Sequence, residues 1–386
     1  MSNFFNAIGV ADMEKVHSAV IGWILSDKCC AFNINQKSSI LCKMFGLVNP
    51  REYKTINVLV ETYDIDILIE TVDKQGQSEC WIIENKVKSN QHDNQLDKYV
   101  DIIQGRKMTK GKTPQQICTK YLNIPDTNQH YCFLTLITEQ PRGNYAKKWT
   151  NIKYDAFCSI LSTFSNSMNA HIDSEIIKEY TTCISKMAQV LVDFLKTPNN
   201  YPNVFTDGSK KKTQKNMTKI DTYKGGQDAI YIAENGLETI FQKCYMGIMA
   251  KGIQYPYEIK ETHGNAMLNI DVTNSICWNK VRSKYPNNNL QAGIEFQNGT
   301  LKIQIHDMGN INKTSIGYFN NNWIKAFQKA SNPSKNINPS KNNGRYYVSK
   351  TLWKKSDWWV NAINWEVTIQ NCITELQDAV NNHPEE

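Results

Sequence analysis

The sequence predicts a mixed α/β fold in the first half of the chain and a separate α+β domain in the second half. Helix and strand patterns alternate through residues 1–197, whereas strand patterns dominate after a polar, basic stretch. The length of 386 residues also exceeds what one ordinary core accommodates. We therefore expect a domain at 1–197, a basic linker at 198–225 and an α+β domain at 226–386.

The composition is that of a folded protein with an uneven charge. Hydrophobic residues make up 40% and aromatic residues 10%, which is enough for packed cores. Residues 1–197 hold 22 Lys and Arg against 21 Asp and Glu, a net charge of +1, and residues 198–386 hold 22 against 16, a net charge of +6. A basic second half favours an anionic partner such as nucleic acid.

Cysteine usage and hydropathy indicate the compartment. The chain has eleven cysteines, none of them in a C-x-x-C pair, and several lie inside apolar runs. This pattern favours reduced, buried thiols over a disulfide framework or a zinc site. The amino-terminus lacks a signal-peptide pattern, and no apolar run is long enough to span a bilayer. We therefore expect a cytoplasmic protein without a membrane partner.

The first domain should open with a half-buried helix over residues 12–25, followed by a β-hairpin. Apolar residues at helical spacing line one face of the helix, and Asp12 is the expected N-cap. Strand patterns follow at 58–61, 64–70 and 80–87. The last two are separated by turn-forming residues at 73–76, so we expect them to pair as neighbours.

The rest of the first domain alternates between helices and one buried strand. The elements expected are a helix at 91–104, a polar and basic insertion or lid at 105–129, a strand buried on both faces at 131–138, and helices at 154–163 and 174–195. This order predicts a small mixed sheet between helices.

The second half offers weaker signals. We expect helices at 237–250 and 360–380 and strands at 267–272, 290–296, 301–306 and 346–349. Asn298-Gly299 predicts a tight hairpin turn, and the short repeat at 332–342 is interpreted as a flexible loop. Tryptophans interleaved with lysines at 350–365 suit either base stacking or an ordinary core.

Two carboxylates and a lysine should meet at the end of the predicted hairpin. Side chains alternate across a strand, so Glu84 and Lys86 project from one face while Asn85 points to the other. Antiparallel pairing would bring Asp66 close to Glu84. Burying these charges without a partner would be costly, and a divalent cation would neutralise the carboxylates.

Magnesium is the cation that this donor set suits. Mg²⁺ prefers hard oxygen ligands and keeps several of its waters. Asp66 and Glu84 would supply carboxylate oxygens, and the backbone carbonyl of Asn85 could be a further ligand. Lys86 would then orient or help to deprotonate an attacking water and stabilise negative charge on phosphorus.

The spacing of these residues resembles a known nuclease signature. Asp66, then seventeen residues, then Glu84-Asn85-Lys86 is similar to the D…(D/E)-x-K pattern of the PD-(D/E)XK nuclease superfamily. Gln95 and Tyr99 are similar to the Q-h-x-x-Y motif of RecB-like and lambda-exonuclease-like members, and lie one helical turn apart. The E-x-x-H-S string at 14–18 and the W-x-x-I-x-Y string at 149–154 resemble one uncharacterised bacterial branch. The resemblance covers about residues 10–195.

This resemblance implies a restriction-endonuclease-like sheet and a metal-dependent phosphodiesterase. It implies Mg²⁺, with Mn²⁺ as a possible substitute, and nucleic acid, with DNA favoured, as the partner. The implied catalytic-site residues are Asp66, Glu84, Lys86, Gln95 and Tyr99, and the implied metal ligands are Glu14, Asp66, Glu84 and Asn85. Restriction, phage defence and repair are the biological settings that the family suggests.

Several alternatives stay open. Asp64 or Glu61 could serve as the upstream acid in place of Asp66, where Ile65 stands at the position of the motif's proline. The carboxylates could form an ordinary cross-strand charge pattern, and His17 is expected to be structural. The alternative function is a catalytically inactive protein that binds nucleic acid or docks a protein partner, including a second copy of the chain.

Overall fold

The chain divides into two compact units, Met1–Val192 and Asp193–Glu386, which are described separately. The computed structural model describes residues 3–48, 51–87, 91, 94–106, 120–136, 140–168, 172–201, 204, 226–262, 265–281, 290–307, 313–329, 337–342, 345–353 and 365–384. Most of the expected linker at 198–225 lies outside these residues. The expected domain limits therefore stay predictions.

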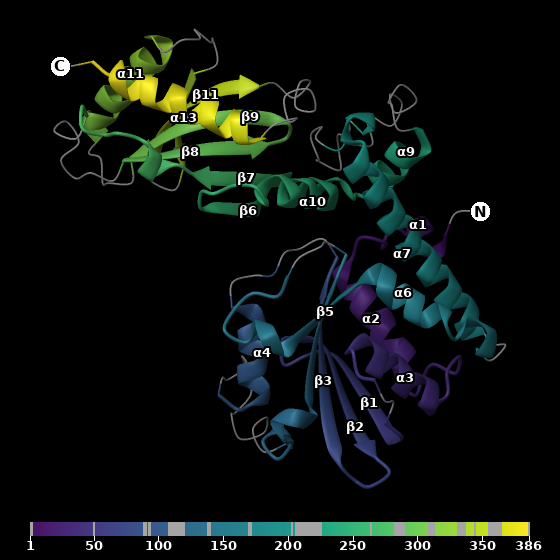
Figure 1. Cartoon of the computed structure of the whole chain (residues 1–386). Coiled ribbons are helices and arrows are strands. Elements are labelled where there is room, and N and C mark those ends of the chain that lie inside the picture. The colour runs from purple at the N-terminus through teal and green to yellow at the C-terminus, as the bar shows by residue number, and fades with distance from the viewer. Residues whose placement is uncertain are drawn as a thin grey trace. The chain divides into compact units, whose positions relative to one another are not determined.

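A five-stranded mixed sheet forms the centre of the first unit (Figure 1). Its strands, in spatial order, are β1 (Tyr53–Thr62), β2 (Ile65–Asp73), β3 (Ser78–Lys86), β4 (Gln129–Thr135) and β5 (Trp149–Lys153). β1, β2 and β3 pair antiparallel, whereas β3, β4 and β5 pair parallel. The predicted hairpin is confirmed, with Ile67 of β2 opposite Ile83 of β3.

Helices lie on both faces of this sheet. They are α1 (Phe4–Ala7), α2 (Glu14–Leu25), α3 (Ile34–Met44), α4 (Gln95–Ile103), α6 (Tyr154–Ser162) and α7 (Ile172–Lys196). α4 covers one face, and α2, α3 and α6 cover the other (Figure 1). Under α4, side chains of the sheet and the helix form one buried apolar cluster that includes Leu68, Ile82, Leu96, Val100 and Phe133. The expected mixed α/β fold is confirmed.

Some elements of this unit differ from the expectation. The first helix begins at Glu14 with Met13 as its N-cap residue, so Asp12 is not the N-cap. β1 is ten residues long, and both β5 and α3 were not expected. α3 begins with a capping box, in which Asn33 and Gln36 bond each other's backbone amides. The expected lid at 105–129 lies largely outside the described residues.

The second unit contains a six-stranded antiparallel sheet with helices, which confirms the expected α+β class. Its strands are β6 (Tyr257–Thr262), β7 (Asn265–Asp271), β8 (Leu290–Gln297), β9 (Thr300–Asp307), β10 (Ile337–Asn342) and β11 (Arg345–Trp353), in the spatial order β10-β11-β9-β8-β7-β6. Its helices are α9 (Gly226–Glu234), α10 (Glu238–Ala250), α11 (Lys313–Lys329) and α13 (Trp365–Asn381). Asn298 and Gly299 both have positive φ in the β8–β9 turn, as predicted.

The structure contradicts one expectation for the second unit and bears on another through a single residue. The second copy of the repeat forms edge strand β10, so the flexible-loop interpretation is wrong there; an edge strand tolerates Pro339 because its outward side needs no ladder bond. Trp365 packs edge-on against Phe296 with ring centroids 5.3 Å apart, as in an ordinary core. Trp358 and Trp359 lie outside the described residues.

Within the described part of the chain, no helix combines the length and apolar character that crossing a bilayer requires.

Candidate active site

Three charged side chains meet where strands β2 and β3 run beside each other. The pairing of Ile67 with Ile83 sets the register, so Asp66 and Glu84 project from the sheet face that α4 covers. Glu84 is completely buried and Lys86 is 5% exposed. The backbone N–H of Asn85 donates to Asp66 Oδ2 at 2.8 Å, which holds that carboxylate against β3.

The two carboxylates stand in an environment that disfavours their charge. Burial, then repulsion from Asp66, raises the pKa of Glu84 to about 8, although Lys86 opposes the shift. Burial also raises the pKa of Asp66, against the lowering effect of the Asn85 amide and of Lys86. Two buried acids that repel each other are poised to receive a cation.

Lys86 is the positive member of this cluster. Its Nζ lies 2.5 Å from Glu84 Oε1. Burial lowers the pKa of Lys86, but Glu84, Glu14 and Asp66 together outweigh burial and leave the pKa above its ordinary value. Lys86 is therefore an ammonium in this state, able to donate hydrogen bonds.

Tyr99 of α4 lies beside the Glu84 carboxylate, and Gln95 of the same helix contacts Tyr99. Gln95 Nε2 donates to the Tyr99 hydroxyl oxygen at 2.9 Å. The Tyr99 hydroxyl lies close enough to Glu84 to lower the pKa of that carboxyl, and the two carboxylates raise the pKa of Tyr99 in addition to its burial. The helix thus places Tyr99 of the Q-h-x-x-Y motif beside Glu84, with Gln95 bonded to Tyr99.

Asn85 points to the opposite face of the sheet, and its side chain is clamped there. Its Nδ2 donates to the backbone carbonyl of Glu14 and to Ser18 Oγ, both at 3.0 Å. The Tyr154 hydroxyl donates to its Oδ1. These contacts tie β3 to α2 and α6, so the backbone that carries Glu84 and Lys86 is fixed from behind.

This clamp contains residues that sequence reasoning had not assigned to the site. The strings at 14–18 and 149–154, singled out only for their resemblance, meet at Asn85 through Ser18 and Tyr154. His17 is buried, with Nε2 2.9 Å from the Ala11 carbonyl and Nδ1 3.1 Å from the Tyr180 hydroxyl. His17 therefore has a structural environment, as expected.

The other candidate acids have different neighbours. Glu14, at the start of α2, accepts a hydrogen bond from the Val87 backbone at 2.9 Å and raises the pKa of Lys86. Asp64 pairs with Lys98 at 2.7 Å and its side chain is 53% exposed. Glu61 is also exposed and lies 3.9 Å from Lys15. Of the three possible upstream acids, Asp66 is the one bonded to β3.

The donor set fits a hard divalent cation. Glu84 Oε2 is buried and accepts no hydrogen bond from the described residues. A buried acceptor without a partner costs free energy, and a bound cation would remove that cost. Within the described part of the chain, no group of three or more His, Cys, Asp or Glu side chains is arranged to hold a metal. Two carboxylates with a backbone carbonyl and waters suit Mg²⁺, which retains much of its hydration.

Comparison with known proteins assigns the family. The family model described as the PD-(D/E)XK nuclease superfamily matches residues 2–196, a span that contains every candidate residue of the site. No curated protein and no solved structure shows significant similarity to the chain. The resemblance expected from Asp66, Glu84 and Lys86 is confirmed, and the chain belongs to the PD-(D/E)XK nuclease superfamily.

Proposed function

We propose that this protein is a Mg²⁺-dependent nuclease that hydrolyses phosphodiester bonds in DNA. The observation that carries the proposal is the buried cluster of Asp66, Glu84 and Lys86, in which a carboxylate with a pKa of about 8 has one oxygen without a hydrogen bond from the described residues. Family membership supports a phosphodiesterase. The DNA substrate and the residue roles are our inference.

Asp66 and Glu84 would hold the cation, with the Asn85 backbone carbonyl as a further ligand and Glu14 next to the site. A bound divalent cation would polarise a phosphate oxygen and acidify a water. Mn²⁺ can replace Mg²⁺ in such an oxygen-rich site. The Asn85 side chain is committed to Glu14, Ser18 and Tyr154, so only its carbonyl is proposed as a ligand.

Lys86 would act on the water and on the phosphate. As an ammonium it donates hydrogen bonds, which orient an attacking water and stabilise the charge that develops on a non-bridging phosphate oxygen. Deprotonating the water would require Lys86 to lose its own proton first, and the Glu84 carboxylate opposes that loss. Orientation and charge stabilisation are therefore the proposed roles of Lys86.

Tyr99 and Gln95 would act as positioning residues. The Tyr99 hydroxyl lies beside Glu84, and the Gln95 amide restricts the rotation of that hydroxyl through its 2.9 Å bond. A ligand carboxylate held at a fixed angle binds its cation more tightly, by about 10- to 100-fold in known sites.

The test is DNA cleavage by the purified protein. Single-stranded and double-stranded DNA, linear and circular, is incubated with Mg²⁺, Mn²⁺ or EDTA, beside a Lys86→Ala variant and a Lys98→Ala control that loses an exposed lysine of α4. We expect metal-dependent cleavage by the wild-type protein and by Lys98→Ala, and none by Lys86→Ala. Cleavage in EDTA, or full activity of Lys86→Ala, would contradict the proposed site.

A further inference from the structure

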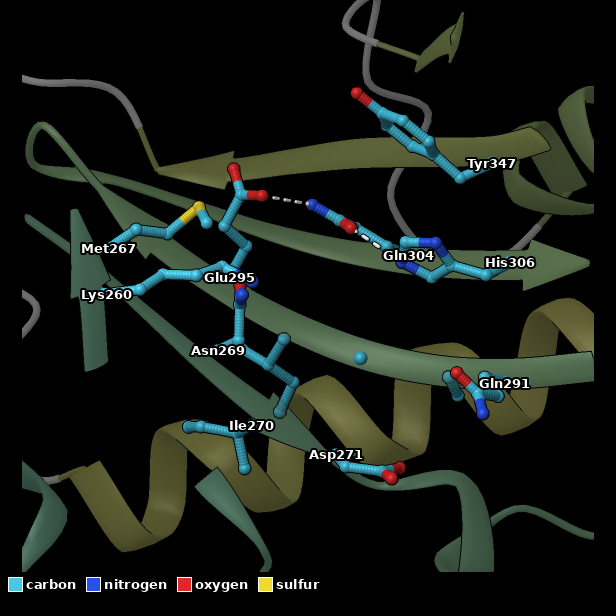
Figure 2. A pocket seen from close by; sticks show the side chains of 13 residues that line it. Lys260, Met267, Asn269, Ile270, Asp271, Gln291, Glu295, Gln304, His306 and Tyr347 are labelled. Atoms are coloured by element: carbon cyan, nitrogen blue, oxygen red, sulfur yellow. Dashed lines mark hydrogen bonds between the residues drawn. The ribbon is translucent and has the colours of Figure 1, made fainter. Parts of the chain in front are cut away.

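The sheet of the second unit has one face that packs against helices and one polar face with a hollow. Alternate side chains of β8 and β9, such as Ile294 and Ile303, are buried on the helix side. The hollow on the other face has a volume of about 480 Å³, within the size range of ligand sites. It is lined by residues of β6, β7, β8, β9 and β11 (Figure 2).

The floor of the hollow is formed by the backbone around a glycine. Gly293 stands between Asp271 on one neighbouring strand and Gln304 on the other. Side chains rise on both sides of this position: Figure 2 shows Glu295 and Met267 at one end and His306 and Tyr347 at the other. Because Gly293 carries no side chain, the floor leaves room between these walls for a planar occupant.

The wall beside Tyr347 is aromatic. The rings of His306 and Tyr347 are stacked, with centroids 5.3 Å apart and an angle of 30° between their planes. Both side chains line the hollow and are half-buried. Such a platform suits stacking by a flat π-system.

The charges near the hollow are balanced within the protein. The Glu295 carboxylate accepts hydrogen bonds from Lys302 at 2.9 Å and from the Gln304 side-chain amide nitrogen at 2.8 Å. The side-chain amide oxygen of Gln304 lies 2.8 Å from His306 Nε2. The other two charged lining residues, Lys260 and Asp271, have opposite signs, so the groove is polar without an excess of positive charge. Its lining suits hydrogen bonding to a neutral group better than binding to a phosphate.

Amide side chains complete the lining. Asn269 and Gln291 reach the hollow from β7 and β8 (Figure 2). An amide carries both donors and an acceptor, which matches the mixed edges of nucleobases. Stacked rings, a floor open at Gly293 and amide side chains together suit an unpaired base.

We infer that this groove binds an unpaired base of single-stranded nucleic acid, and so contributes to substrate recognition; this rests on the proposed nuclease function. The second half of the chain has a net charge of +6, from 22 Lys and Arg against 16 Asp and Glu, which favours the phosphates that accompany the base. The base stacks on the Tyr347 side of the groove, while the backbone of the strand lies outside it.

The test is binding of a fluorescent single-stranded oligonucleotide of about 12 nucleotides, as DNA and as RNA, to the full chain in EDTA. We expect Tyr347→Ala to weaken binding by about 5- to 100-fold through lost stacking, whereas Tyr347→Phe keeps it. Gly293→Leu should weaken binding by filling the hollow. A Cβ at Gly293 meets only the Ile270 carbonyl at 3.5 Å, so the strand accommodates the change.

Gly252→Leu is the matched control, since a Cβ there meets no atom within 4 Å and Gly252 does not line the groove. It should bind like wild type. Equal affinity of wild type, Tyr347→Ala and Gly293→Leu, or no binding of either oligonucleotide by wild type, overturns the inference. If Tyr347→Ala and Gly293→Leu bind more weakly but the wild-type chain does not cleave DNA with Mg²⁺, the groove binds the base and the proposed nuclease function is wrong.

Discussion

Asp64 and Asp66 lie two residues apart but meet different neighbours. Asp66 accepts a hydrogen bond from the Asn85 amide and burial raises its pKa, while Asp64 is exposed and paired with Lys98. Asp66→Asn should lower the cleavage rate at least 100-fold, because the cation loses a charged ligand. Asp64→Asn should keep the rate within about twofold, because an exposed pair contributes little. The rates are compared in a single-turnover assay. A larger loss of rate in Asp64→Asn than in Asp66→Asn would assign the metal ligand to Asp64 instead.

His17 couples the fold around the site to pH. Burial lowers the pKa of His17 to about 4, against about 6.5 in an unfolded chain. As pH falls from 6.5 towards 4, His17 binds a proton in the unfolded chain but stays neutral in the folded state, so the free energy of unfolding decreases. By this linkage His17 lowers stability by about 2 kcal/mol between pH 7 and pH 5.

Replacing His17 tests this coupling. His17→Gln has no group that titrates there, so its free energy of unfolding should change less than that of wild type between pH 7 and pH 5. Some pH dependence should persist, because burial also lowers the pKa of His130 to about 4. Urea unfolding at the two pH values measures the difference. An equal change in both proteins would mean that His17 does not contribute.

The sheet face on which each site residue lies could be predicted from its spacing along the strand. The alternation of side chains placed Glu84 and Lys86 on one face and Asn85 on the other, as the structure has them. The contacts of Asn85 were not predictable, because Ser18 and Tyr154 come from elements about 70 residues away on either side in the sequence. Whether the assigned residues bind metal stays a prediction.

At the scale of elements, a loop is fixed to the helix that carries Gln95 and Tyr99. Asp97 is buried and accepts from the backbone amides of Asn144 and Tyr145, both at 2.9 Å. Gly143 has φ +117°, and a Cβ there would lie 2.6 Å from the Asp97 carboxylate. The glycine is thus required both by its backbone conformation and by the space beside it.

Gly143→Ala should therefore destabilise the protein by about 2–4 kcal/mol, since it strains the backbone and displaces Asp97 from its two bonds. Gly76→Ala is the matched control: its φ is +83° but a Cβ meets no atom within 4 Å, so only the backbone cost of about 1 kcal/mol applies. Denaturant unfolding compares the two. If Gly76→Ala lowers the free energy of unfolding as much as Gly143→Ala does, the contact with Asp97 does not contribute to the effect.

Central elements were easier to predict than edge elements. β3 and β4 are buried on both faces and stand out as apolar runs, whereas β1 is an edge strand with a single buried position and was expected to be short. β10 is likewise an edge strand, rich in polar residues and containing Pro339. An edge strand forms because it hydrogen-bonds to a neighbouring strand, and the hydrophobic pattern of its own residues does not identify that neighbour.

At the scale of the whole molecule, the candidate active site and the base-binding groove belong to different units. All candidate residues of the site lie within residues 2–196, which the family model covers. The groove is built from strands β6, β7, β8, β9 and β11 of the second unit. The division suggests separate tasks, with chemistry in the first unit and substrate contacts in the second.

A fragment ending at residue 197 tests this division. Its net charge is +1, against +7 for the whole chain, so it should bind DNA more weakly and with a smaller dependence on salt. The logarithm of the binding constant is measured against the logarithm of salt concentration, and each lost phosphate contact reduces the slope by about one. Equal slopes for fragment and full chain would place the DNA contacts in the first unit.

Calorimetric titration can show directly whether Asp66 and Glu84 hold a divalent cation. Mn²⁺ and Mg²⁺ are titrated into the wild-type chain and into Glu84→Gln, with Asp64→Asn as the control. We predict binding to wild type and to Asp64→Asn, and its loss in Glu84→Gln, because the buried carboxylate is the expected ligand. Absence of binding to wild type, or undiminished binding to folded Glu84→Gln, would contradict the account.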